Sequence, residues 1–168
     1  MAATDEDYLG RLFRNDATLT TLALNKKVED GGAGRLAEAL ATNSTLTTLS
    51  LNENWNRVGD EGAGRLAEAL TTNSTLTALN LATNSVRDEG ARRLAQALAT
   101  NSTLTTLNLA TNWFEAAGAG HLAEALVINS TLFTLNLYGN MVGEEGAGHL
   151  ADALTINSSL AILDLGIN

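Results

Sequence analysis

A tandem repeat runs through almost the whole sequence and constrains the fold more than any other feature. The stretch NSTLTTLNLATN, residues 101–112, has close counterparts that begin at Asn43, Asn73, Asn129 and Asn157. Aligned on their first leucine, the units begin at residues 19, 46, 76, 104, 132 and 160, so the steps are 27, 30, 28, 28 and 28 residues. A unit of this length is too small to bury an apolar face alone, so neighbouring units must stack into one array.

The first half of each unit predicts a short strand. Its pattern is L-x-x-L-x-L-x-x-N, for example Leu104, Leu107, Leu109 and Asn112. The last two leucines alternate with polar residues at a period of two, which is typical of a strand with one buried face. We therefore expect the leucines to face the core and the Thr, Ser and Asn residues between them to face solvent.

The second half of each unit predicts an amphipathic helix. DEGAGRLAEAL, from Asp60, has leucines four residues apart with alanines between them. Acidic residues such as Asp60, Asp88 and Glu144 stand at the start of these segments, where the positive end of their own helix favours them. We expect a left-handed backbone at the asparagines that follow the last apolar turn, which are Asn43, Asn73, Asn101, Asn129 and Asn157.

Repetition of strand, loop, helix and loop in one direction builds a parallel sheet with helices on one side, joined by right-handed crossovers. Packed helices need roughly 8 to 10 Å each and paired strands only about 4.8 Å, so the stack bends with its strands on the concave side. The fold class is therefore an α/β solenoid. We divide the single domain, 1–168, into a capping helix at 1–15, five repeats at 16–156 and a partial sixth repeat at 157–168.

These residues resemble the leucine-rich repeat proteins. The 28-residue period and the LAEAL helix are similar to the ribonuclease-inhibitor-like subfamily, and similar arrays occur in nucleotide-binding immune receptors, bacterial effectors and Roco-type proteins. The resemblance implies a horseshoe whose concave sheet and adjacent loops bind a protein partner. It also implies a ladder of asparagines whose side-chain amides satisfy the backbone of the loops, at Asn54, Asn84, Asn112, Asn140 and Asn168.

Composition argues against several classes of partner. The net charge of -9 repels phosphate backbones and anionic lipids, so we expect neither nucleic acid nor a membrane surface as partner. No apolar run is long enough to span a bilayer, and MAATDEDYLG starts with acidic residues where a secretory signal carries positive charge. The absence of cysteine fits a reducing compartment, and we predict a cytoplasmic protein.

The sequence predicts no enzyme, no cofactor and no metal site. His121 with Glu124 and His149 with Asp152 lie one helical turn apart on neighbouring helices, so a surface metal site is geometrically conceivable. Arginine stands at the same position in earlier repeats, for example Arg65, which favours an ordinary solvated face. The paired glycines at the helix starts lack the fuller dinucleotide pattern, and no Ser, His and Asp set interrupts the repeat.

Binding residues are sought where a unit departs from the repeat, because a purely structural position is filled alike in every unit. The largest departures are Trp55, Trp113, Tyr138 and Met141, which we place at the rim of the sheet. These residues either anchor a partner or fold over neighbouring loops. The outward strand and loop positions Glu53, Asn80, Asn108 and Asn136 complete the predicted binding surface.

Two further hypotheses concern the surface of the array. A column of threonines, including Thr106 and Thr134, suggests an ice-binding or structural array, although Ala78 and Ile162 interrupt the column and the sheet is expected to be curved. The last predicted strand has an open edge, and the final units are more apolar than the others. We therefore predict a homodimer through this edge, or pairing with further repeats. The self-association residues are Leu160, Ile162, Leu163 and Ile167.

Overall fold

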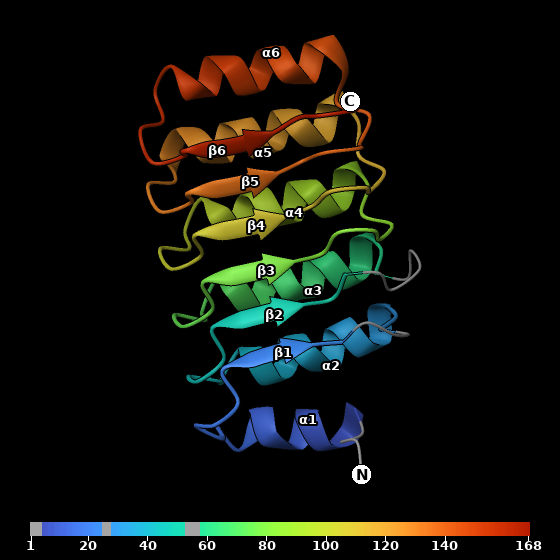
Figure 1. The fold of residues 1–168 in the computed structure, drawn as a ribbon, viewed down its shortest axis with the longest axis vertical. Helices are drawn as coiled ribbons and strands as arrows, with labels where there is room; N and C mark the ends of the chain where they lie inside the picture. Colours follow the sequence, from blue (N-terminus) through green and yellow to red (C-terminus); the bar gives the residue numbers. More distant parts are fainter. Residues whose placement is uncertain (1–4, 25–27, 53–57) are drawn as a thin grey trace.

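The computed structural model describes residues 5–24, 28–52 and 58–168, in which helices and strands alternate. The helices are α1 (Asp5–Phe13), α2 (Asp30–Leu40), α3 (Asp60–Leu70), α4 (Asp88–Leu98), α5 (Ala116–Ile128) and α6 (Gly143–Leu154). The strands are β1 (Thr21–Ala23), β2 (Thr48–Ser50), β3 (Ala78–Asn80), β4 (Thr106–Asn108), β5 (Thr134–Asn136) and β6 (Ile162–Asp164). The strands form one layer and the helices the other, with α1 at one end of the stack and α6 at the other (Figure 1). This arrangement confirms the predicted α/β solenoid.

The strands form one parallel sheet in the order β1-β2-β3-β4-β5-β6. Its register aligns the central leucines of neighbouring strands, so that Leu79 lies opposite Leu107 and Leu107 opposite Leu135. These three side chains are at most 1% exposed, whereas the flanking Thr106 and Asn108 are half-buried. A shift of one residue would turn the whole leucine row outward, so burial of the row fixes the register.

The helices pack on the buried face of the sheet, opposite its open face, through the leucines and alanines of the repeat. In α4, Leu94, Ala95 and Leu98 are buried, and α2, α3 and α5 bury the equivalent residues. Phe114 is fully buried in the position that Val86 occupies one repeat earlier. The interior is therefore continuous from one repeat to the next.

The aspartates in the first helical turn cap the helix of the next repeat. Oδ1 of Asp60 accepts hydrogen bonds from the backbone N–H groups of Arg87 at 2.7 Å and Gly90 at 2.9 Å. We predicted that these carboxylates act on their own helix, but their hydrogen bonds reach the next one. The same pairs of bonds join Asp30 to residues 59 and 62, and Asp88 to residues 115 and 118.

This series of aspartates, the aspartate ladder, ends at α5. Ala116 occupies the position of Asp60 and Asp88, so α6 begins beside a methyl group in place of a carboxylate. The backbone differs there as well: Val142 is helical and Gly143 has a φ of +63°, whereas the residues before α3, α4 and α5 are extended. Helix α6 therefore starts differently from the helices before it.

The predicted left-handed backbone at the asparagines after the helices is wrong. Asn129 is extended, with φ -69° and ψ 130°, and the left-handed non-glycine residues of the described chain are Asn15, Thr83, Thr111 and Ile167. These asparagines instead point inward, because the carbonyls at the end of a helix lack partners within it. We call the set Asn43, Asn73, Asn101, Asn129 and Asn157 the helix-end asparagines.

Asn101 shows the arrangement. Its Nδ2 donates to the carbonyl of Leu70 in the preceding repeat at 2.8 Å. Its Oδ1 accepts from the N–H groups of Thr103 at 3.0 Å and Leu104 at 2.8 Å. Each helix-end asparagine thus joins two repeats and starts the next strand.

Among the described helices, none combines the length and apolar character that crossing a membrane requires.

Candidate partner-binding surface

The loops that follow the strands are held in place by the predicted asparagine ladder positions. Nδ2 of Asn112 donates to the carbonyls of Leu81 and Leu109, both at 3.0 Å, and its Oδ1 accepts from the N–H of Val86 at 3.0 Å. In the same way Asn84, Asn140 and Asn168 donate to the carbonyls of Leu51, Leu109 and Leu137 in the preceding repeat. These bonds fix the backbone from which the rim side chains project.

The outward side chains of the strands are small or polar, and the asparagines among them serve the backbone. Oδ1 of Asn80, Asn108 and Asn136 accepts a hydrogen bond from the N–H two residues further on, at 2.9–3.0 Å. Turns of this kind hold the chain as it leaves a strand. These three predicted binding residues therefore have a structural task in addition to any contact with a partner.

Trp113 and Met141 lie in adjacent loops at the rim, each directly after a ladder asparagine. Their exposed fractions are 51% and 46%. The N–H of Trp113 donates to the carbonyl of Val86 at 2.9 Å, and the N–H of Met141 donates to the carbonyl of Phe114 at 3.1 Å. In the repeat before Trp113, the same position holds the half-buried Ser85. Two large apolar side chains thus project from a hydrogen-bonded backbone, as anchors of a protein interface do.

Tyr138 connects the rim to the open face of the sheet. It is 38% exposed, and its ring lies over Gly166, where an added Cβ would come within 2.8 Å of Tyr138 Cδ2. Its carbonyl accepts a hydrogen bond from the N–H of Thr111 at 2.6 Å. Glycine at 166 therefore allows the tyrosine ring to extend over the chain that follows β6.

Phe133 is a further large exposed departure from the repeat, although we did not place it among the predicted binding residues. It directly precedes β5 and is 52% exposed. Ile162, also 52% exposed, lies beside it in β6, and its N–H donates to the carbonyl of Phe133 at 3.1 Å. Earlier repeats have threonine in the place of Phe133, for example Thr77 and Thr105. The departure from the repeat that singled out Trp113 also singles out Phe133.

The predicted self-association residues lie at the last strand. Leu160 and Leu163 are half-buried and pack against the core, while Ile162 and Ile167 are exposed, Ile167 by 75%. Their association with a second copy stays a prediction. Trp55, Glu53 and Asn54 lie outside the described residues.

Charge is distributed unevenly along the chain. All ten Lys and Arg residues lie within residues 1–98, and residues 99–168, which we call the C-terminal half, contain none. The C-terminal half contains six acidic residues: Glu115, Glu124, Glu144, Glu145, Asp152 and Asp164. Glu115 forms a backbone bridge with Met141, so a carboxylate stands next to the rim. Trp113, Phe133 and Tyr138 therefore lie in a region of negative charge.

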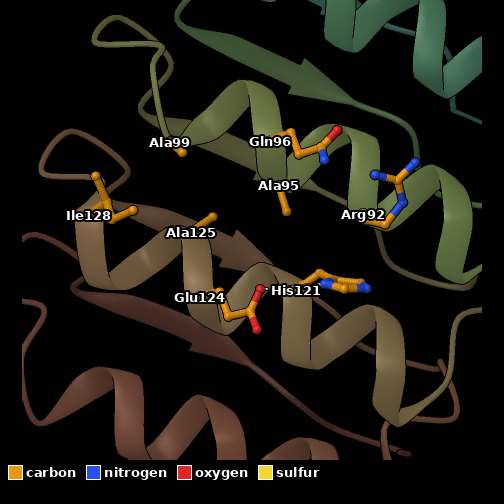
Figure 2. A pocket seen from close by; sticks show the side chains of 8 residues that line it. All are labelled: Arg92, Ala95, Gln96, Ala99, His121, Glu124, Ala125 and Ile128. Atoms are coloured by element: carbon orange, nitrogen blue, oxygen red, sulfur yellow. Dashed lines mark hydrogen bonds and ion pairs between the residues drawn. The ribbon is translucent and has the colours of Figure 1, made fainter.

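The helical side has a shallow groove of about 430 Å³ between α4 and α5 (Figure 2). Ala95 and Ala125 line it together with His121, Glu124 and Ile128. Nδ1 of His121 lies 3.5 Å from Oε2 of Glu124. Across the described ranges, no three His, Asp or Glu side chains are grouped as metal ligands would be. We therefore place the candidate binding surface at the apolar rim and not in this groove.

Comparison with solved structures shows the same fold in other proteins. The structure named "Leiomodin-1 Actin-Binding Site 2 (ABS2)" is 24% identical with a TM-score of 0.72, and the match covers 92% of each chain. The Caenorhabditis elegans tropomodulin C-terminal domain is 18% identical with a TM-score of 0.72, covering 91% of this chain and 92% of that one. The Chaetomium Mex67:Mtr2 subunits are 18% identical with a TM-score of 0.52, covering 96% and 90%.

No curated protein matches the sequence. The sequence model described as "TMOD/LMOD Leucine-rich domain" matches residues 3–112, which is more than half of the chain. The leucine-rich repeat resemblance is thereby confirmed, while the ribonuclease-inhibitor-like subfamily and the likeness to immune receptors and Roco-type proteins stay predictions. The chain belongs to the TMOD/LMOD leucine-rich domain family.

Proposed function

We propose that this chain is a noncatalytic protein-binding module whose rim and open sheet face contact its partner. The observation that carries the proposal is the group of exposed apolar side chains, Trp113, Tyr138 and Met141, on the hydrogen-bonded loops beside the sheet. Burying such side chains in a partner releases water from apolar surface, and tryptophan and tyrosine are the residue types that most often dominate a protein interface.

We propose actin as the partner. One of the similar structures is named as an actin-binding site of leiomodin-1, and the family model groups this chain with leucine-rich domains of tropomodulin and leiomodin type. The likeness extends over 92% of both chains, so most of this fold has a counterpart in that structure. Shared architecture of this extent supports actin as the first protein to test.

The finer assignments belong to the same proposal. A cytoplasmic location is supported by the absence of cysteine, and the ribonuclease-inhibitor-like subfamily by the 28-residue steps of the last four units. An ice-binding or structural array is a weaker alternative. The threonine column is broken at Ala78 and Ile162, and the exposed aromatics interrupt any regular hydroxyl surface.

Trp113→Ser tests the proposal, because serine is the residue at the equivalent position of the preceding repeat and should leave the fold intact. Binding of the purified chain to labelled monomeric actin is measured by fluorescence anisotropy, and binding to filaments by co-sedimentation. We expect a micromolar or tighter complex that Trp113→Ser weakens about tenfold or more.

Phe13→Ser is the matched control, since Phe13 is 50% exposed at the opposite end of the solenoid. It should bind actin like the unmodified chain, and thermal melts should show both variants folded. Failure of the unmodified chain to bind either form of actin would sink the proposed partner. Equal binding by the Trp113→Ser chain would remove the rim from the proposal.

A further inference from the structure

Strand β5 has an exposed aromatic residue at each of its ends. Phe133 directly precedes the strand and Tyr138 follows it by two residues, with exposed fractions of 52% and 38%. The equivalent positions hold Thr105 and Ala110 at β4, and small or polar residues at β2 and β3 as well. The two aromatics are five residues apart, which corresponds to about 16 Å along an extended chain. Strand β5 therefore differs from β2, β3 and β4 in having a large aromatic residue near each end.

Strand β6 continues this surface. Ile162 lies opposite Thr134 and beside Phe133, and Gly166 lies under the ring of Tyr138. Between them Asp164 lies opposite Asn136. The exposed apolar side chains of Ile162 and Tyr138 therefore stand towards opposite ends of this pair of strands, with the exposed Phe133 at the start of β5 and a carboxylate between them.

The turn that the Asp164 side chain makes needs its oxygen as an acceptor but does not need its charge. Its Oδ1 accepts a hydrogen bond from the N–H of Gly166 at 2.9 Å, as Oδ1 of Asn136 accepts one from the N–H of Tyr138 at 2.9 Å. An asparagine can make this turn without any charge, and β3, β4 and β5 all have one at this position. The negative charge at Asp164 is therefore not required by the local structure.

The charge of this region indicates which kind of partner fits the surface of β5 and β6. The C-terminal half has six acidic residues and no Lys or Arg, so no Lys or Arg of this half faces Asp164. A second copy of the chain would bring like charge to the interface, because residues 1–98 are themselves negative, with thirteen acidic against ten basic residues. A partner that supplies Lys or Arg next to apolar side chains matches both features.

We infer that a partner segment containing Lys or Arg lies along β5 and β6 on the open face of the sheet. Its apolar side chains contact Phe133 and Tyr138, and its cation pairs with Asp164. The inference rests on the proposed function, since it names the part of the sheet that binds and the chemistry of the segment bound. It spans about five extended residues, the length that separates the two aromatics.

Selection of random peptides displayed on phage, on the immobilised full chain, tests this inference independently of actin. The enriched peptides are synthesised and titrated against the chain at low and at physiological salt. We expect them to combine several Lys or Arg residues with aromatic or aliphatic ones, and to lose affinity as salt rises.

Variants that copy other repeats show where the peptides bind. Phe133→Thr and Tyr138→Ala introduce the residues found at β4, and each should weaken binding about tenfold. Asp164→Asn introduces the residue found at β5; it should weaken binding about threefold and reduce the salt dependence. Phe13→Thr is the control for loss of an exposed phenylalanine and should have no effect, while circular dichroism shows that each variant is folded.

Several results would overturn the inference. They are the absence of any enriched peptide, enrichment of neutral or acidic peptides, and binding that Phe133→Thr and Tyr138→Ala leave unchanged. The two proposals fail separately. If actin does not bind while cationic peptides depend on Phe133 and Tyr138, the proposed partner is wrong and this inference stands. If actin binds through Trp113 and the selected peptides ignore β5, this inference alone is wrong.

Discussion

The two halves of the solenoid have the same interior and different surfaces. Leu49 of β2 and Leu135 of β5 are both fully buried and occupy equivalent places in the leucine row. On the surface, residues 1–98 hold every Lys and Arg, whereas the C-terminal half holds all but one of the large apolar side chains that are exposed in the described ranges, the exception being Phe13. The family model matches up to residue 112, the residue before Trp113.

The contrast shows how a repeat protein acquires a binding surface. Folding requires the buried positions of each unit, so those positions are filled alike throughout. Exposed positions are under no such constraint. Positions held by Ser85 and Thr105 in one repeat can therefore be held by the larger Trp113 and Phe133 in the next. Departures from the repeat at exposed positions therefore identify the surface where function is located.

The largest expected effect tests whether the interior is the same in both halves. Leu49→Ala and Leu107→Ala each remove a fully buried side chain and should each lower the free energy of unfolding by about 2 to 5 kcal/mol. Thr106→Ala, at a half-buried outward position, should cost far less. Urea denaturation of the three variants measures these changes. A Thr106→Ala variant as destabilised as Leu107→Ala would show that the faces of the strand are wrongly assigned.

A smaller effect is expected from the aspartate ladder, which spans the first half and whose last member is Asp88. Asp88→Ala removes the acceptor for the N–H groups of residues 115 and 118, so it should lower the free energy of unfolding by about 0.5 to 2 kcal/mol. Asp88→Asn keeps an acceptor oxygen at this position and should cost less. Chemical denaturation measures both, and equal losses would mean that the hydrogen bonds contribute nothing beyond charge.

The second half offers the reverse experiment. Ala116→Asp extends the ladder to the N–H groups of residues 143 and 146, so the free energy of unfolding should rise. The gain should be smaller than the loss from Asp88→Ala, because Gly143 has a φ of +63° and the start of α6 is not shaped as in the earlier helices. A decrease in stability would show that α6 cannot accept the cap.

The sequence predicted the layers and the leucine row, because alternation and helical periodicity report which side chains are buried. It also placed Trp113, Tyr138 and Met141 as departures from the repeat, and all three are exposed. These features follow from patterns within one unit, which a single sequence shows directly.

The connections between units could not be read in the same way. The helix-end asparagines were expected to have a left-handed backbone, but they hydrogen-bond to carbonyls of the preceding repeat. Asp60 was assigned to its own helix and instead caps the next one. Asparagine and aspartate are both typical of local caps and turns. Only the spacing of the stacked units decides whether their hydrogen-bond partner lies in their own repeat or in a neighbouring one.

The smallest expected effect concerns the Arg–Glu ion pairs of the first half, because the second half contains no Lys or Arg. Both oxygens of Glu89 accept hydrogen bonds from Arg92 at 2.7 Å, and Nε of Arg93 donates to Oε1 at 2.7 Å. The hydrogen bonds from Arg92, and then those from Arg93, lower the pKa of Glu89 from 4.5 to about 2. The carboxylate is therefore harder to protonate in the folded chain than in the unfolded chain.

The sign of the pH effect follows from this difference. The stabilisation from Glu89 is fully present above pH 4.5 and is lost as the pH falls from 4.5 towards 2, because the unfolded chain takes up the proton first. Glu89→Gln should flatten the decline of the melting temperature over this interval, and Arg92→Gln combined with Arg93→Gln should flatten it equally. Added salt should shrink the effect, since the side chain of Glu89 is 43% exposed. An unchanged acid profile in both variants would show that these ion pairs do not stabilise the first half of the solenoid.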